Sequence, residues 1–140
     1  MAKPNPSTKS FLGRARGLGA SRSGVSHWWS QRITAIALLP LVAYAVFGFV
    51  SVADSDQAIA RAWLAQPINT IAMLLLLLVG FYHASLGLQT IIEDYIANET
   101  RRILILALVQ ISIWLAATAG VYSVLNIALT TPRVIQGVGG

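Results

Sequence analysis

The sequence contains no cysteine, and only 11% of its 140 residues are charged. The absence of cysteine excludes disulfides, thiolate-held iron–sulfur clusters and cysteine-type zinc sites, which leaves histidine as the natural soft metal ligand. A soluble domain would carry about a quarter charged residues, whereas 56% of this chain is hydrophobic. With a mean hydropathy of +0.67, the composition predicts an all-α integral membrane protein.

Acidic residues are missing from the N-terminal segment, residues 1–32, which is rich in Ser and Gly. Its six basic residues are Lys3, Lys9, Arg14, Arg16, Arg22 and Arg32. A secretory signal would have a short basic region and a short apolar core, so we expect a retained basic tail. An organelle transit peptide is the alternative for the first twenty residues. Nucleic-acid binding could also use the net charge of +5, but membrane topology explains a basic tail beside apolar spans, and we expect no nucleic-acid partner.

Three apolar stretches are long enough to cross a bilayer as helices, for which about 20 residues are needed. They cover residues 33–52, 68–92 and 103–129. Pro40 lies inside the first stretch and is expected to kink that helix. The polar segments 53–67 and 93–102 are expected to be loops, and residues 130–140 a short C-terminal tail. The sequence therefore predicts one three-helix transmembrane domain between two tails.

Three spans place the two termini on opposite sides of the membrane. Eight of the Lys and Arg residues belong to the side of the N-terminal tail and the second loop, counting Arg101 and Arg102. The other side has two, Arg61 and Arg133. The positive-inside rule then predicts an inner N-terminus and an outer C-terminus. We expect the inner (cytoplasmic) membrane of a bacterium, in preference to the mitochondrial inner membrane.

The second apolar stretch contains His83 and ends in the pair Asp94-Tyr95. An ionisable side chain within a membrane-length apolar run is costly, which makes it a functional candidate. At about 100° per residue, His83 and Asp94 return to nearly the same helix face, roughly 16 Å apart along the axis. We therefore expect an imidazole near mid-membrane and a polar pair at the water boundary on one face.

Three roles are open for His83: a hydrogen bond between helices, a proton relay, or the axial ligand of a haem. Gly80 and Gly87 would clear space for a planar macrocycle, but with Ala84 they would equally suit a helix-packing seam. A six-coordinate haem needs a second ligand, and the other histidine, His27, is expected before the first span, at the surface. If His83 binds haem, another subunit or a second copy must supply the opposite ligand.

The predicted orientation places His27, Arg32, Asp94 and Tyr95 at the inner membrane boundary. A quinone head group needs hydrogen-bond donors to its carbonyls, and its reduction needs protons from water. Tyr95 as donor, with Arg32 and Asp94 shaping the local field, would suit such a site. Each residue also has an ordinary explanation, because Tyr belongs to the interfacial aromatic belt and Arg to inner helix ends.

At these residues the sequence resembles the hydrophobic membrane anchor subunit of succinate dehydrogenase, the D-type subunit of respiratory complex II. Two motifs carry the resemblance: His83-x10-Asp94-Tyr95 and Ser26-His-Trp-Trp-Ser-Gln-Arg-Ile-Thr-Ala-Ile36. The plan of a basic tail followed by three spans also agrees, from Gly24 to roughly Leu129.

The resemblance implies that His83 is one axial ligand of haem b, the second coming from a C-type cytochrome b anchor subunit. It also implies that Tyr95 hydrogen-bonds ubiquinone, with Asp94 nearby. Arg32 and His27 would lie near the haem propionates and the quinone pocket. In this family an iron–sulfur subunit and a flavoprotein subunit carry the remaining redox groups, consistent with the absence of cysteine here.

The sequence thus predicts an anchor that is no enzyme by itself. Within its complex it would help to pass electrons from succinate to ubiquinone, in the respiratory chain and the tricarboxylic acid cycle. One alternative is the haem-bearing anchor of a fumarate reductase or another quinone-linked enzyme. The other is a small non-redox membrane protein whose histidine only packs helices.

Overall fold

The computed structural model describes residues 21–131 of the chain, with side chains from Val25 onward. This part consists of four helices and contains no strand. They are α2 (Ser21–Val52), α3 (Gln57–Leu64), α4 (Pro67–Tyr95) and α5 (Glu99–Thr130). The expected basic tail up to residue 20 and the C-terminal tail beyond residue 131 lie outside the described residues. The predicted all-α class is confirmed for the part between them.

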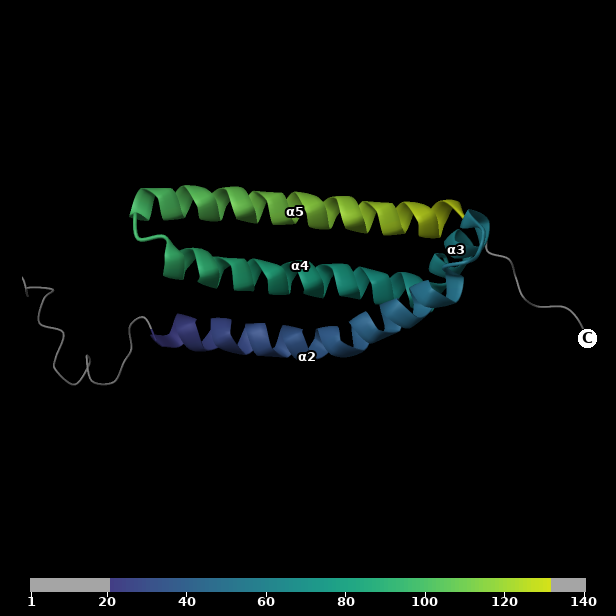
Figure 1. Ribbon diagram of the computed structural model, residues 1–140, viewed down its shortest axis with the longest axis horizontal. Coiled ribbons are helices and arrows are strands. Elements are labelled where there is room, and N and C mark those ends of the chain that lie inside the picture. The colour runs from purple at the N-terminus through teal and green to yellow at the C-terminus, as the bar shows by residue number, and fades with distance from the viewer. Residues whose placement is uncertain (1–20, 132–140) are drawn as a thin grey trace, which may run out of the picture.

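The three long helices form a single layer with α4 in the middle (Figure 1). Helix α4 packs against α2 on one side and α5 on the other, whereas the backbones of α2 and α5 stay apart. Successive long helices run in opposite directions, so α2 begins at one end of the layer and α5 finishes at the other (Figure 1). Because the layer is one helix thick, both of its faces are open.

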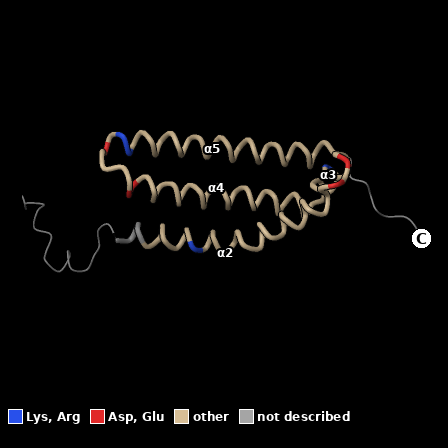
Figure 2. The backbone as a smooth tube through the Cα atoms, viewed as in Figure 1, with Lys and Arg blue, Asp and Glu red and all other residues tan. Residues whose placement is uncertain are grey.

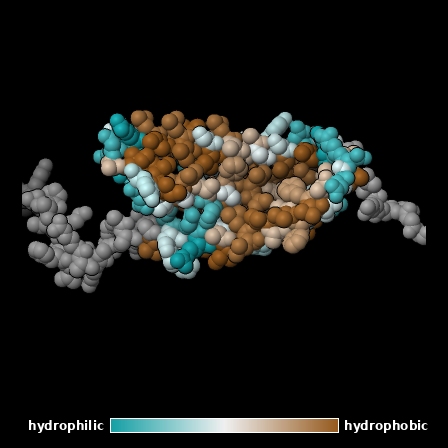
Figure 3. Space-filling view, in the orientation of Figure 1, coloured by the Kyte–Doolittle hydropathy of each residue, from teal (hydrophilic) through white to brown (hydrophobic). Residues whose placement is uncertain are grey.

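The predicted three membrane spans are confirmed in number. The candidate spans by length and composition are Val25–Val52, Pro67–Tyr95 and Glu99–Thr130. Hydrophobic side chains cover most of the visible face of the layer, and hydrophilic ones gather toward its two ends and in a patch part-way along its lower edge (Figure 3). The charges of α4 and α5 likewise lie near the layer's ends, whereas α2 carries a basic residue part-way along its length (Figure 2).

Helix α2 begins much earlier than the expected span. No proline or glycine occurs between Gly24 and Pro40, so nothing in this segment interrupts the helix. The candidate span Val25–Val52, defined by length and composition, therefore includes His27, which the sequence analysis expected before the first span. Pro40 lies inside α2, and Figure 1 shows α2 bending in its second half, as the sequence predicted.

The segment expected as the first loop contains the short helix α3, which the sequence analysis missed. Its Trp63 packs against α2, where a Cβ at Gly48 would lie only 2.2 Å from Trp63 Cζ2. Asn69 of α4, only 2% exposed, donates to the Trp63 carbonyl at 2.6 Å and accepts a hydrogen bond from the Tyr44 hydroxyl of α2. These contacts join α2, α3 and α4 at one end of the layer, which we call the α3 end.

At the opposite end, α4 and α5 are joined by only three residues, Ile96, Ala97 and Asn98. Asn98 is the N-cap of α5, and its side chain accepts a hydrogen bond of 3.0 Å from the Arg101 backbone N–H. Asn is a favoured N-cap, and Glu99 in the first turn complements the helix dipole. Both helices therefore extend into the segment expected as a loop.

Candidate functional site

His83 lies near the middle of α4, on the face that packs against α2. Its Nδ1 is 2.9 Å from Thr34 Oγ1, and its Nε2 is 3.5 Å from Gln31 Nε2. The side chain is half-buried. Helix α2 thus places two polar side chains against the imidazole in an otherwise apolar region. Both ring nitrogens therefore have a polar neighbour.

The glycines on either side of His83 face the same helix. A Cβ at Gly87 would lie 3.3 Å from Gln31 Nε2, and one at Gly80 would lie 3.8 Å from Leu38 Cδ2. Ala84, by contrast, is exposed. Within this chain, Gly80 and Gly87 therefore form a packing seam against α2, one of the two roles the sequence left open.

The contacts of His83 also fix how α2 and α4 lie side by side. Since Gln31 lies next to His83 and Gly87, Arg32 lies at about that depth and not at the end of α4. At a rise of about 1.5 Å per residue, the eight residues from Gly87 to Tyr95 place Arg32 roughly 12 Å from Tyr95 along the axis. The structure thus does not bring Arg32 together with Asp94 and Tyr95. The Arg32 guanidinium instead lies 4.2 Å from the ring centroid of Trp28.

Asp94 and Tyr95 form the end of α4. Both side chains are exposed, and the Tyr95 side chain is 86% exposed. His83 lies on the side of α4 that α2 covers, whereas the Tyr95 side chain is exposed at the end of the layer. Within the single chain, these two residues therefore do not form a closed pocket with His83.

A cavity of about 760 Å³ does lie between α2 and α4 on this half of the layer. Its lining consists of His27, Trp28, Gln31, Gly87, Gln89, Thr90, Ile91 and Glu93. His27 Nε2 and Gln31 Oε1 are buried without a hydrogen-bond partner. Buried polar atoms of native proteins are nearly always paired, so this His27 cavity offers two vacant hydrogen-bonding positions.

Sequence reasoning named His27 but missed Gln31 and Thr34. These three residues are spaced by four and then three positions, so they share one helical face. This spacing could have identified Gln31 and Thr34 from the sequence alone. The residues on the other side of the cavity carried a similar signal, because Gln89, Thr90 and Glu93 are related by three and four positions and also lie on one side of α4. Gln89 Nε2 donates to Glu93 Oε1 at 2.8 Å, so this pair is satisfied within its own helix.

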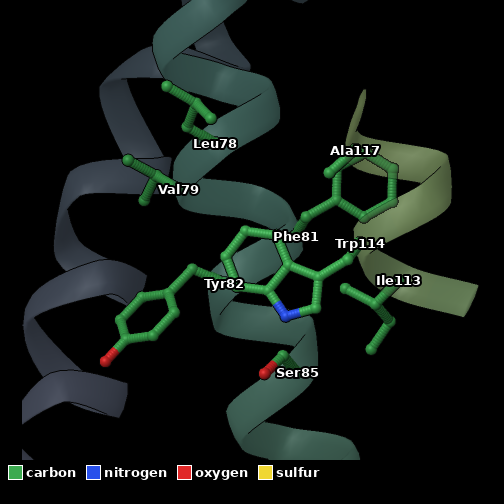
Figure 4. A pocket seen from close by; sticks show the side chains of 8 residues that line it. All are labelled: Leu78, Val79, Phe81, Tyr82, Ser85, Ile113, Trp114 and Ala117. Atoms are coloured by element: carbon green, nitrogen blue, oxygen red, sulfur yellow. The ribbon is translucent and has the colours of Figure 1, made fainter. Parts of the chain in front are cut away.

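A second cavity, of about 300 Å³, lies between α4 and α5. Figure 4 shows Trp114 of α5 lying over the α4 side chains, with Phe81 beside it and Ser85 below. Ser85 Oγ is 3.4 Å from Gln110 Oε1 of α5, the contact that links these two helices by polar groups. The cavity faces away from α2 and carries no charged residue, so it is separate from the His83 site.

The donor set for a metal is a single imidazole. Between residues 21 and 131, no group of three or more His, Asp or Glu side chains could hold a metal ion. A haem, in contrast, needs one imidazole per axial position, and it supplies the other iron ligands itself. His83 meets that requirement because Thr34 contacts only one of its ring nitrogens. The other nitrogen, Nε2, lies 3.5 Å from the Gln31 amide nitrogen. A rotation of the Gln31 side chain would leave this nitrogen free to bind a metal.

Comparison with known proteins identifies the type of chain. Residues 1–119 match the family described as succinate dehydrogenase/fumarate reductase transmembrane subunit. The chain belongs to this family. The hydrophobic membrane anchor subunit of succinate dehydrogenase from Rickettsia bellii is 40% identical over 101 residues, covering 71% of this chain and 81% of the relative.

Two further relatives carry the same name. The protein from Rickettsia conorii is 32% identical, with 74% of this chain and 82% of the relative covered. The protein from Paracoccus denitrificans is 28% identical, with 82% and 88% covered. No solved structure gives a significant match. The chain is thus a membrane anchor in the succinate dehydrogenase/fumarate reductase family, a non-catalytic component that works with partner subunits.

Proposed function

We propose that the chain is the D-type anchor of a succinate:ubiquinone oxidoreductase, holding one side of a haem b and part of the ubiquinone site. A C-type cytochrome b anchor completes both sites, and an iron–sulfur subunit and a flavoprotein subunit dock on the inner side. Electrons from succinate pass through these subunits to ubiquinone. The relatives named as succinate dehydrogenase anchors support this assignment.

The observation that carries the haem proposal is the setting of His83. It lies near the middle of a membrane-spanning helix with one ring nitrogen bound to Thr34 and the other contacted only by a movable amide. The opposite axial ligand comes from the C-type subunit. His27 is the other histidine of the chain, and it lies about a helical turn from Gln31 toward the start of α2, away from His83.

The register of α2 and α4 divides the remaining predicted residues into two groups. Arg32 and His27 belong to the candidate membrane span of α2. His27 lines the His27 cavity and Arg32 lies close to it. There the two residues would bind haem propionates and neutralise their charge. Tyr95 and Asp94 lie at the exposed end of α4, where Tyr95 donates a hydrogen bond to a ubiquinone carbonyl. Asp94 and nearby water supply protons at that end.

We infer the orientation from the basic residues. Arg101 and Arg102 follow the short α4–α5 connection, and α2 begins at the same end of the layer (Figure 1). This end lies on the inner side by the positive-inside rule. The membrane is the inner membrane of a bacterium, in keeping with the relatives from Rickettsia and Paracoccus.

The family includes fumarate reductase subunits, so a fumarate-reducing complex is the second candidate. Both complexes would need the same haem and quinone geometry in this chain. Assays of the purified complex with succinate as donor and with fumarate as acceptor distinguish them. Faster succinate oxidation at matched quinone and quinol concentrations would favour the first candidate.

The test of the haem proposal is the dithionite-reduced minus oxidised spectrum of the detergent-purified complex, for wild type and His83→Ala. We expect a b-type signal in the wild type that is lost in an assembled His83→Ala complex. Full b-type absorbance in the variant, or none in the wild type, would remove haem ligation from the proposed function.

A further inference from the structure

The hydroxyl of Thr34 lies within hydrogen-bonding distance of two backbone carbonyls of its own helix. Its Oγ1 lies 2.7 Å from the Ser30 carbonyl oxygen and 3.1 Å from the Gln31 carbonyl oxygen. Carbonyl oxygens only accept hydrogen bonds, so a hydroxyl proton donated to either of them points into its own helix. In that arrangement Thr34 Oγ1 presents a lone pair to His83, and His83 Nδ1 donates the proton of the 2.9 Å contact.

The second contact of the ring agrees with this assignment. A neutral imidazole that carries its proton on Nδ1 has a lone pair on Nε2. The atom of Gln31 nearest to Nε2 is its amide nitrogen, at 3.5 Å, which is a donor. Thr34 and Gln31 of α2 thus favour the same tautomer of His83, each through a different ring nitrogen.

We propose that Thr34 is a positioning residue for His83: its hydroxyl fixes the Nδ1–H tautomer and aims Nε2 as the only available metal-binding nitrogen. Gln31 occupies that nitrogen in the chain by itself and must rotate away when iron binds. This inference rests on the proposed function, since it assigns a role toward the haem that His83 would bind.

The hydrogen bond also changes the electronic character of the ligand. An imidazole that donates Nδ1–H to an acceptor is a more basic ligand, and such partners orient and tune metal-bound histidines. A more basic ligand stabilises ferric more than ferrous haem, so the Thr34 contact lowers the haem midpoint potential. Removal of the hydroxyl should therefore raise that potential.

Thr34→Val tests the proposal because it replaces the hydroxyl by a methyl group of similar size. We expect the assembled complex to keep a b-type haem while binding of ferric relative to ferrous haem weakens about tenfold, the lower end for loss of such a partner. For a one-electron couple this is a rise of about 59 mV in the midpoint potential. Thr34→Ser should restore the wild-type value, because it keeps the hydroxyl.

Thr118→Val is the matched control. Thr118 Oγ1 donates to the Trp114 carbonyl of its own helix at 2.8 Å, and this exposed hydroxyl bonds to no other described helix. The control should leave the potential unchanged. An unchanged potential in Thr34→Val, or an equal rise in Thr118→Val, would overturn the role of Thr34 while leaving haem binding by His83 intact. Loss of the proposed function itself would appear separately, as a wild-type complex without a His83-dependent b-type signal.

Discussion

The indole ring of Trp63 occupies the space directly above the backbone of Gly48. A Cβ at position 48 would lie 2.2 Å from Trp63 Cζ2 and 2.6 Å from Trp63 Cη2, and Phe49 supports the same ring with its centroid 5.8 Å away. The absence of a side chain at Gly48 is therefore what allows α3 to pack against α2.

Gly48→Ala should consequently destabilise the α3 end of the layer. Overpacking of a close contact costs about 1–3 kcal/mol, and the rigid ring cannot move away by a simple rotation. We expect a lower midpoint of thermal unfolding for the purified complex. Gly80→Ala is the control, because a Cβ there meets its nearest atom at 3.8 Å; equal losses of stability in both variants would contradict this account.

The hydrogen bond between Tyr44 and Asn69 gives a second prediction. Asn69→Ala removes the acceptor of the Tyr44 hydroxyl and the donor to the Trp63 carbonyl, and unmet buried polar groups cost about 1–3 kcal/mol. Tyr44→Phe should cost about 0.6 kcal/mol, the average for interhelical hydrogen bonds in a membrane protein. The double variant should lose less stability than the sum, because both changes break one shared bond. Additive losses, measured by thermal unfolding, would show that the two residues are independent.

Tyr95→Phe tests the quinone assignment. Loss of one hydrogen bond, worth about 0.5–1.5 kcal/mol, should reduce the rate of ubiquinone reduction roughly two- to thirteenfold. Succinate oxidation by an artificial acceptor should stay at the wild-type rate, because that route does not use the quinone site. Tyr122→Phe is the matched control, since this tyrosine is also exposed, at 67%, but lies on α5. A Tyr95→Phe complex with wild-type quinone kinetics would exclude Tyr95 as the donor.

The absence of cysteine makes the orientation directly testable. Ala53 and Ala97 are exposed and lie in the connections at opposite ends of the layer. We expect a membrane-impermeant maleimide to label Ala53→Cys in spheroplasts. Ala97→Cys should react only after the membrane is opened. The reverse pattern would place the N-terminus outside.

The sequence was sufficient to predict three spans, because long charge-free stretches have few alternatives in a bilayer. Helix α3 was missed for a physical reason: eight residues are too few to form a stable helix alone. The helix depends on Trp63 and Asn69, which are contacts made across the fold. Local sequence patterns do not report such contacts.

The site was predictable only in part. The position of His83 within an apolar run identified it directly as a candidate. The depth of Arg32 relative to Tyr95, in contrast, depends on how α2 and α4 align, which hydrophobic stretches without a fixed end do not determine. Thr34 and Gln31 acquire their significance only when that alignment brings them to the imidazole.

The single layer of helices affects how long an unassembled copy of the protein persists in the cell. An unassembled copy exposes polar groups such as the Tyr82 side chain, 45% exposed near the middle of α4, to hydrocarbon that cannot hydrogen-bond them. Partner subunits that cover the faces of the layer would remove this penalty. The supply of partners should therefore set how long each newly made copy survives, and an excess of this chain should be degraded rather than accumulate.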